Sequence, residues 1–238
     1  MYVGPSADKI NPTQHVTHDH QLVDNIADKN PYYCELTALY ALWKTGEALP
    51  DKTVGLVHYR RRFIDAKPTA YRFFEWISRT DGLRNLARNW FFRHEIRYQK
   101  AEEILSSGKY DIILPQPERL KYSVAKHYAK LHYMNDLEIV RNIIRERYPD
   151  YLFAFDVCIH DNECSPYNMF ISRQAVLNQY APWIFDILSH AEQLISVEGR
   201  TKNQARVFGF LAERLFNVYV LKNKLRIKHM PVFLFRRE

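Results

Sequence analysis

The pattern of apolar and polar residues along the chain predicts a mixed α/β fold. A short apolar run from Val54 to Val57 ends abruptly in the polar segment 58–62, which predicts a buried strand that delivers cations to its carboxyl end. Similar apolar runs predict three further strands, at residues 109–115, 152–159 and 166–171. Apolar residues at helical spacing predict four helices, over residues 30–43, 132–144, 174–190 and 203–221.

The segment from Ala70 to Arg97 differs from the rest of the chain, because aromatic residues alternate there with arginines. Thr80, Asp81 and Gly82 divide it into two short predicted helices. Arginine-rich helices with Trp and Phe are typical of interfacial membrane binding. A helical hairpin packed on the core would show the same periodicity, so membrane binding and core packing both stay open as interpretations.

Composition limits the classes of protein to which the chain can belong. A length of 238 residues suits one α/β domain over residues 1–238, and a net charge of +7 favours anionic partners such as nucleotides, nucleic acid or an anionic membrane surface. No long apolar segment or apolar signal core is present, so we expect a cytoplasmic protein. The three cysteines form no CxxC pair and predict reduced thiols.

The end of the first predicted strand is the main candidate for chemistry. In open α/β sheets, ligands bind outside the carboxyl ends of the strands, and guanidinium groups match the geometry of phosphate. Arg60 and Arg61 therefore predict a phosphate-bearing substrate. A strand that simply leaves the core is the alternative, but no Gly, Pro, Asp or Asn stands between Val57 and Phe63 to form an ordinary turn.

Other polar residues fall beside predicted core faces. Glu35 lies on the flank of the first long helix and needs a partner, and Asn168 carries an amide that looks buried. His132 and Asp136 are one helical turn apart, a spacing at which they could contact each other, bind hydroxyl groups or move protons; a structural pair is the alternative.

The last helix carries one polar stripe. Arg206, Phe210, Glu213 and Asn217 share this stripe beside an apolar face. Arg206 and Glu213 are two turns apart, too far to neutralise each other, so we expect each to meet another group.

Several short motifs, taken in order, resemble a family of bacterial capsular and exopolysaccharide glycosyltransferases long known only as a domain of unknown function. The resemblance covers the chain from Asp24 to Val220, and its motifs are DNIADKNPYYCELTALYALWK, VGLVHYRRRF, YDIILP, HYMNDLE, YPDY, YNMFIS and QARVFGFLAERLFNVYV. It implies a single GT-A-like domain with a mixed central sheet flanked by helices. It also implies a nucleotide-sugar donor, a UDP-hexose or UDP-galactofuranose, and a growing lipid-linked glycan as the acceptor, at the inner face of the plasma membrane.

The resemblance also implies roles for individual residues. Glu213 is the candidate catalytic base and Asp136 its alternative. The candidate donor-binding residues are Asp24, Asn25, Glu35, His58, Tyr59, Arg60 and Arg61. The candidate acceptor-binding residues are His132, Asp136, Tyr167, Asn168 and Arg206.

The chain departs from the family pattern in two places, and from most GT-A enzymes in a third. A first strand of the type IYVATHK, which normally precedes the segment matching Met1–Gly4, is missing, which implies a truncated start or a weakened donor site. Residues 70–97 are longer and more aromatic than the family pattern predicts. No Asp-x-Asp motif stands at a strand end to hold a metal, so we expect the arginines to replace it; a divalent Mn or Mg ion is the alternative.

Three functions compete at this point. The first is a glycosyltransferase, which the ordered motifs favour. The second is a non-catalytic paralogue that binds a nucleotide-sugar or glycan, and the third is a basic nucleic-acid-binding domain. No recognisable nucleic-acid-binding module supports the third, so we expect no nucleic-acid partner.

Overall fold

The central sheet of the protein has four strands and is mixed, as the sequence predicts. The computed structural model describes residues 19–46, 48–58 and 60–235; the segment where the family's first strand was expected lies outside them. The strand order is β1-β6-β3-β7, and the bounds are Thr53–Leu56 for β1, Ile112–Pro115 for β3, Phe170–Arg173 for β6 and Ile227–Met230 for β7. β6 runs antiparallel to β1 and β3, whereas β3 and β7 are parallel.

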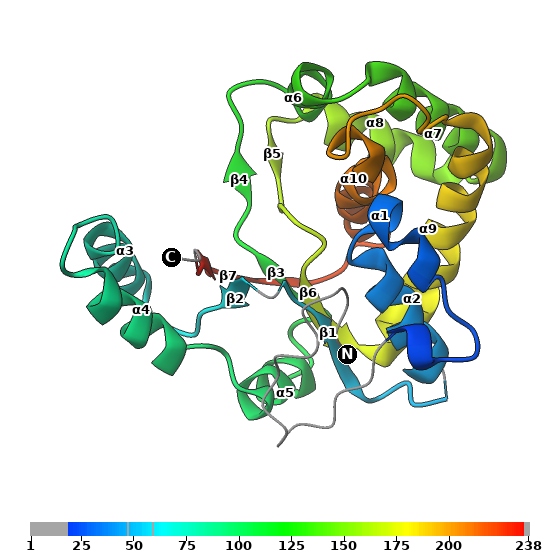
Figure 1. The fold of residues 1–238 in the computed structure, drawn as a ribbon. Helices are drawn as coiled ribbons and strands as arrows, with labels where there is room; N and C mark the ends of the chain where they lie inside the picture. The colour runs from blue at the N-terminus through cyan, green and yellow to red at the C-terminus, as the bar shows by residue number, and fades with distance from the viewer. Residues whose placement is uncertain (1–18, 47, 59, 236–238) are drawn as a thin grey trace.

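Two short antiparallel ribbons extend from this sheet. β2 (Arg61–Phe63) pairs with β8 (Val232–Leu234), and β4 (Glu118–Arg119) pairs with β5 (Glu163–Cys164). In Figure 1 the β4–β5 ribbon rises from the sheet toward α6, between the α3–α4 hairpin and the larger group of helices.

Helices cover both faces of the sheet. α2 contacts β1, α9 contacts β6, and α5 also contacts β6. The helices are α1 (Asn30–Tyr33), α2 (Leu36–Gly46), α3 (Pro68–Ile77), α4 (Arg84–Arg93), α5 (Tyr98–Ser106), α6 (Val124–Leu131), α7 (Met134–Arg147), α8 (Leu152–His160), α9 (Gln174–Leu194) and α10 (Val207–Lys222). The short 3-10 helices are η2 (Asp19–Gln21), η3 (Ala27–Lys29), η4 (Pro149–Tyr151) and η5 (Gln204–Arg206).

The alternation of side chains along β3 divides the interior into two cores. Ile112 and Leu114 point into the larger core, which the long helices complete, while Ile113 points to the opposite face with Ala101 and Leu105 of α5. Successive strand residues point to opposite faces, so a run that is buried on both sides appears in the sequence as continuously apolar.

The prediction of a strand at residues 152–159 is wrong. These residues form α8, which packs against α10, α6 and α7. Its apolar residues lie on several sides of the helix, so Ile159 is buried while Phe153 and Val157 are exposed. A short apolar run of this kind cannot be told from a strand by periodicity alone.

The first long helix is interrupted, although the sequence predicts it to be continuous. α1 ends at Tyr33 because Cys34 adopts a positive φ of 55°, and α2 begins at Leu36. A left-handed φ is uncommon for a residue with a Cβ and breaks the helical path. Glu35 therefore stands at the start of α2.

Two helices were not predicted. α5 and α6 fill the stretches on either side of β3. α6 begins at Ser123, whose hydroxyl accepts a hydrogen bond from the backbone N–H of Lys126. A serine directly before a periodic segment is an ordinary helix start signal that could have revealed α6.

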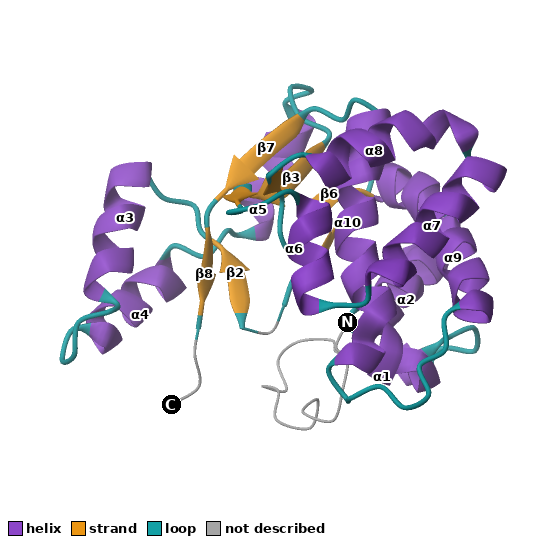
Figure 2. Cartoon of the chain, turned by 90° about the horizontal axis from the view of Figure 1, so that it is seen from above, coloured by secondary structure: helices purple, strands orange, loops and turns teal. Residues whose placement is uncertain are grey.

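The helical insertion is confirmed as the hairpin of α3 and α4, divided at residues 78–83. Its inner face is packed: Phe74 stacks on Trp90 with 4.1 Å between ring centroids, and Phe91 stacks on Phe233 of β8 at 3.6 Å. Its outer face carries exposed apolar side chains, among them Phe73 and Trp76. Figure 2 shows the hairpin set apart from the main helical group. No helix in the described ranges is long and apolar enough to cross a membrane.

Candidate functional site

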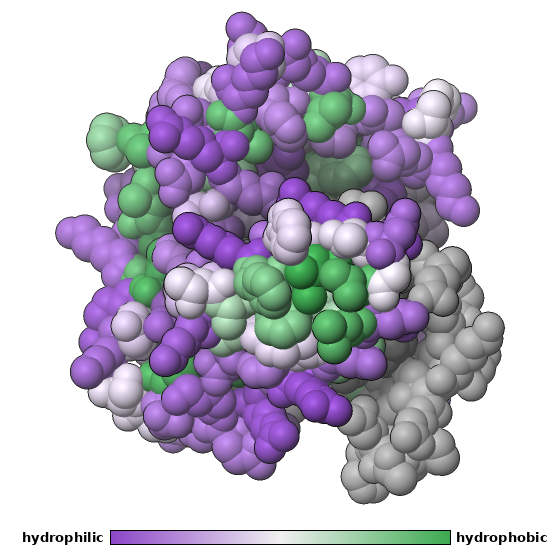
Figure 3. All heavy atoms as spheres, turned by 90° about the vertical axis from the view of Figure 1, so that its left-hand side faces the viewer, coloured by the Kyte–Doolittle hydropathy of each residue, from purple (hydrophilic) through white to green (hydrophobic). Residues whose placement is uncertain are grey.

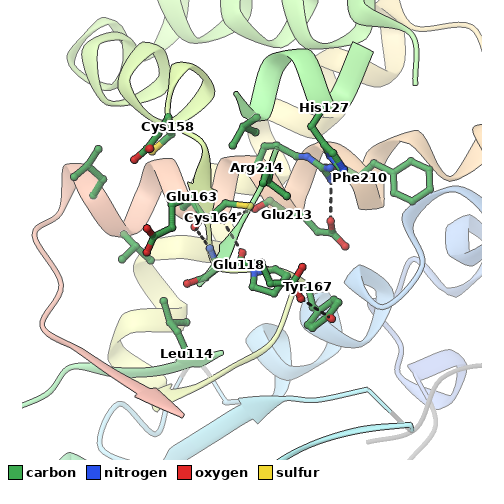
Figure 4. A pocket seen from close by; sticks show the side chains of 18 of the residues that line it. Leu114, Glu118, His127, Cys158, Glu163, Cys164, Tyr167, Phe210, Glu213 and Arg214 are labelled. Atoms are coloured by element: carbon green, nitrogen blue, oxygen red, sulfur yellow. Dashed lines mark hydrogen bonds and ion pairs between the residues drawn. The ribbon is translucent and has the colours of Figure 1, made fainter. Parts of the chain in front are cut away.

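A cavity of about 810 Å³ opens where the β4–β5 ribbon, α8 and α10 meet the ends of the central strands (Figure 4). Residues from seven separate segments line it, which is why no single stretch of sequence predicts it. The predicted residues on its wall are Glu35, His58, Arg60, Arg61, Tyr167, Arg206 and Glu213.

The strand-end cations form one side of the cavity. After β1 the chain turns, and the backbone N–H of Arg61 donates to the carbonyl oxygen of His58 at 3.2 Å, although no typical turn residue is present. The Arg61 guanidinium lies 4.1 Å from the ring centroid of Tyr167, a cation–π contact. The next arginine, Arg62, turns away and pairs with Glu95 at 2.6 Å. Tyr59 lies outside the described residues.

Glu35 and Asn168 are brought together at the base of the cavity. The side-chain amide of Asn168 donates to Glu35 Oε1 at 2.7 Å and to the carbonyl oxygen of Gly209 at 3.2 Å. Both sequence expectations are thereby met: the half-buried carboxylate has a partner and the amide is buried. The amide itself does not line the cavity, so its role is to orient Glu35.

His58 faces Glu35 in a desolvated setting. Its Nε2 atom lies 3.7 Å from Glu35 Oε1. Burial lowers the pKa of His58, an effect that Glu35 opposes and the charges of Arg61, Arg206 and Arg60 reinforce. The imidazole is therefore neutral at pH 7 and can accept or donate one hydrogen bond at that nitrogen.

Three buried polar atoms beside the cavity have no hydrogen-bond partner within the described part of the chain. They are His58 Nε2, Arg61 Nε and Asn168 Oδ1. Buried polar groups are normally paired, because an unpaired one costs about 1–3 kcal/mol. His58 and Arg61 line the cavity, and unpaired atoms at a cavity wall are a feature of a site whose ligand supplies the missing partners.

The predicted polar stripe of the last helix lies on the opposite wall. Arg206, Phe210, Glu213 and Asn217 all line the cavity. Glu213 pairs with the neighbouring Arg214 at 2.8 Å, and not with Arg206, two turns away on the same stripe. Desolvation raises the pKa of Glu213, and the nearby Arg214 opposes that rise.

Asn217 connects this helix to the loop that precedes β6. Its Oδ1 accepts from the backbone N–H of Ser165 at 2.9 Å, and its Nδ2 donates to the carbonyl oxygen of the same residue at 3.0 Å. Tyr167 and Asn168 follow two and three positions later. Asn217 therefore positions the loop, a role that sequence reasoning missed.

Besides Asn168, four predicted residues lie away from the lining of the cavity. Asp24 accepts a hydrogen bond from Tyr40 at 2.7 Å, and Asn25 accepts one from the backbone of Ala27. His132 and Asp136 have separate partners rather than each other. His132 stacks on Phe210 at 4.1 Å, and Asp136 accepts two bonds from Arg200 at 2.6 and 2.8 Å.

The charge of the cavity is balanced rather than uniformly positive. Five cationic side chains line it, namely Arg60, Arg61, Arg206, Arg214 and Lys224, against five carboxylates, namely Glu35, Glu118, Asp161, Glu163 and Glu213. His127 from α6 also reaches the wall. Such a mixture suits a ligand with a charged part and a hydroxyl-rich part, because carboxylates accept hydrogen bonds from hydroxyl groups.

The described residues contain no group of three or more His, Cys, Asp or Glu side chains arranged to hold a metal ion. The cationic side chains that line the cavity are the four arginines and Lys224 already described.

The fold and cavity define a mixed α/β protein with a candidate ligand site beside its central sheet. The chain belongs to the family DUF4422, a domain of unknown function, whose model matches residues 1–224. This match confirms the predicted resemblance to a glycosyltransferase-like family known as a domain of unknown function.

A solved structure described as the apo form of the bifunctional glycosyltransferase WbbM is similar to this chain. The TM-score is 0.75, with 29% sequence identity, and the match covers 93% of this chain and 39% of that one. The chain thus spans about two fifths of the length of WbbM. The similarity confirms the fold class. No curated protein matched the sequence.

The two hydrogen bonds from Arg200 to Asp136 indicate a structural role for this carboxylate, and its effect on stability can be measured. The side chains of Asp136 and Arg200 are only 2% and 13% exposed, so removing one charge leaves the other buried and unpaired. We expect Asp136→Asn to lower the free energy of unfolding in urea by about 3 kcal/mol.

A second carboxylate gives the control. Asp156 makes the same two-bond contact with Arg141, but these side chains are 32% and 37% exposed. Asp156→Asn should cost less than about 1 kcal/mol. A catalytic role for Asp136 would instead appear as lost turnover with the unfolding transition unchanged.

Proposed function

We propose that the protein is a glycosyltransferase that moves a hexosyl group from a nucleotide-sugar, a UDP-hexose or UDP-galactofuranose, to a lipid-linked capsular or exopolysaccharide glycan. The observation that carries the proposal is the unpaired polar atoms of His58 and Arg61, which line the cavity beside its other arginines. The 29% identity to WbbM over 93% of the chain supports the same reaction class.

The strand-end arginines bind the donor in this proposal. Arg60 and Arg61 come from the segment that follows β1, and Arg206 approaches from the start of α10. When the bond between the sugar and the diphosphate breaks, the electron pair goes to the diphosphate, and fixed positive charge stabilises it. Arginine supplies that charge without a metal ion.

Glu213 acts as the base. The acceptor hydroxyl must lose a proton as its oxygen bonds to the sugar, and Glu213 lies on the cavity wall to receive it. Its raised pKa makes it a stronger base than an ordinary glutamate. Tyr167, beside Arg61, and Arg206, just before the helix that carries Glu213, are the proposed acceptor contacts, and Glu35 orients the donor.

The donor site can be tested by exchanging arginines. A charge-assisted contact contributes about 1.5–3 kcal/mol, so Arg60→Ala and Arg61→Ala should each weaken UDP binding by about ten- to a hundredfold in calorimetry. Arg62→Ala is the matched control, because Arg62 pairs with Glu95 outside the lining and its loss should change the affinity little.

The same titration, made in the presence of EDTA, tests metal independence. UDP affinity that survives chelation supports the arginine site. Loss of UDP affinity on chelation would reject the arginine site. An affinity that no substitution of the cavity arginines changes would also reject it.

Glu213→Gln tests the base. It keeps size and hydrogen bonding but removes basicity, so UDP release from nucleotide-sugars should fall at least a hundredfold while UDP affinity persists. In the unchanged protein the rate should rise with pH through the raised pKa of Glu213, because the base acts only when ionised.

Stability provides the control for this variant. Burial raises the pKa of Glu213 in the folded state, so the folded protein disfavours the ionised carboxylate. Any folding stability that this shift contributes is present below pH 4.5 and is lost as the pH rises through the raised pKa. Glu213→Gln should therefore melt at the same temperature or higher at pH 7. Normal turnover in this variant, or an equal loss in Glu163→Gln on the other side of the cavity, would exclude the base and favour a binding paralogue.

The outer face of the hairpin is the proposed contact with an anionic membrane. We expect the protein to float with vesicles of phosphatidylcholine and phosphatidylglycerol, and less as salt shortens the Debye length from about 10 Å at 0.1 M to about 3 Å at 1 M. Trp76→Ala should weaken flotation, whereas Tyr98→Ala, an exposed aromatic on α5, should not. If the same amount of protein floated with vesicles of pure phosphatidylcholine, the membrane contact would be rejected and the hairpin would be a packing element only.

A further inference from the structure

A second cavity, of about 840 Å³, lies between the α3–α4 hairpin, β8 and the segment that follows β3. One wall carries Arg79, just beyond α3, together with Arg84 and Arg88 of α4. Gln116 and Phe233 stand on other walls. Nothing in the donor or base roles described above uses this space.

The second cavity shares part of its wall with the first. Glu118, Pro166 and Tyr167 line both. Tyr167 has a positive φ of 65°, its hydroxyl donates to Glu118 at 3.0 Å, and its ring lies against Arg61. The unusual backbone thus sets this ring between the donor arginines and the second cavity.

Two arginines of the second cavity, Arg79 and Arg84, make exposed ion pairs with neighbours on the hairpin. Arg79 lies 3.4 Å from Glu75, and Arg84 lies 3.1 Å from Asp81; both arginines are more than half exposed. Exposed pairs of this kind contribute about 0–1 kcal/mol. A phosphate group, which accepts paired hydrogen bonds from guanidinium, can therefore compete for them.

Exposed apolar side chains are concentrated on the hairpin that carries these arginines. Phe73 and Trp76 of α3, and Leu86 and Phe92 of α4, are between 47% and 65% exposed. Figure 3, which views this side of the molecule, shows an apolar patch bordered by hydrophilic side chains. Cations beside exposed aromatic groups match a ligand with an anionic head and an apolar tail.

We propose that the second cavity is the acceptor site, and that Arg79, Arg84 and Arg88 bind a phosphate group that links the acceptor's sugar to an apolar chain. The sugar end then extends past Gln116 toward Tyr167, where the two cavities meet, and the chain lies along the apolar face of the hairpin. This inference rests on the proposed function, since it names the class of acceptor for that reaction.

Inorganic pyrophosphate is the first probe, added to protein saturated with UDP. One pyrophosphate should still bind, because UDP occupies the other cavity. Arg84→Ala/Arg88→Ala should weaken this binding at least tenfold. Arg72→Ala/Arg93→Ala removes the same charge from exposed arginines of the hairpin that do not line the cavity, and should have little effect.

The result distinguishes the two proposals. Arg60→Ala/Arg61→Ala should abolish UDP binding yet leave one pyrophosphate site, so a failed donor site is visible separately from a failed acceptor site. Complete displacement of pyrophosphate by UDP, or equal loss in both hairpin variants, would overturn the second cavity as a phosphate site.

Farnesyl diphosphate then separates a lipid-linked phosphate from a free one. We expect it to bind at least tenfold more tightly than pyrophosphate in the presence of UDP, and Trp76→Ala should remove that advantage without changing pyrophosphate affinity. Equal affinity for the two probes would overturn the lipid-linked class of acceptor.

Discussion

Asn217 of α10 holds the site in place, because its amide pairs with both backbone groups of Ser165. A side chain that satisfies an N–H and a carbonyl together fixes both the position and the direction of the loop. Its Nδ2 also donates to the carbonyl oxygen of Glu213, so the same amide joins the loop to the turn that carries the proposed base. Tyr167 and Asn168 take their places from this attachment.

A second constraint lies at the break between α1 and α2. The positive φ of Cys34 ends α1 and places Glu35 at the first turn of α2, where the helix dipole favours a carboxylate. Gly209 permits this arrangement, since a Cβ there would lie 3.2 Å from the Cys34 sulfur. The amide of Asn168 then spans from Gly209 to Glu35, and three distant segments meet in one hydrogen-bonded group.

The sequence predicts best what depends on local periodicity. The stripe of Arg206, Phe210, Glu213 and Asn217 follows from helical geometry alone, and all four residues do line the cavity. The possible contact of His132 with Asp136 does not form, because it depends on residues from elsewhere in the chain. Sequence spacing shows which residues can contact each other. Arg200, 64 positions away, donates two hydrogen bonds to Asp136 and is therefore its partner instead of His132.

The cavity itself could not be predicted, because it depends on how separate elements pack. Arg214, His127 and Glu118 reach it from α10, α6 and the β4–β5 ribbon, and none carries a local signal that distinguishes it from a surface residue. The misassigned α8 illustrates the same limit, since its apolar run fits a strand as well as a helix until its neighbours are known.

The histidine at the strand end links ligand binding to protonation. Burial holds His58 neutral, so protons bind more readily to the unfolded chain, and the contribution of His58 to stability is complete above pH 6.5 and decreases below it. The neighbouring arginines strengthen this effect, because each adds repulsion to a protonated ring. An anionic ligand between those arginines would cancel part of that repulsion and raise the pKa again. The charge arrangement that leaves His58 unpaired therefore also couples ligand binding to proton uptake.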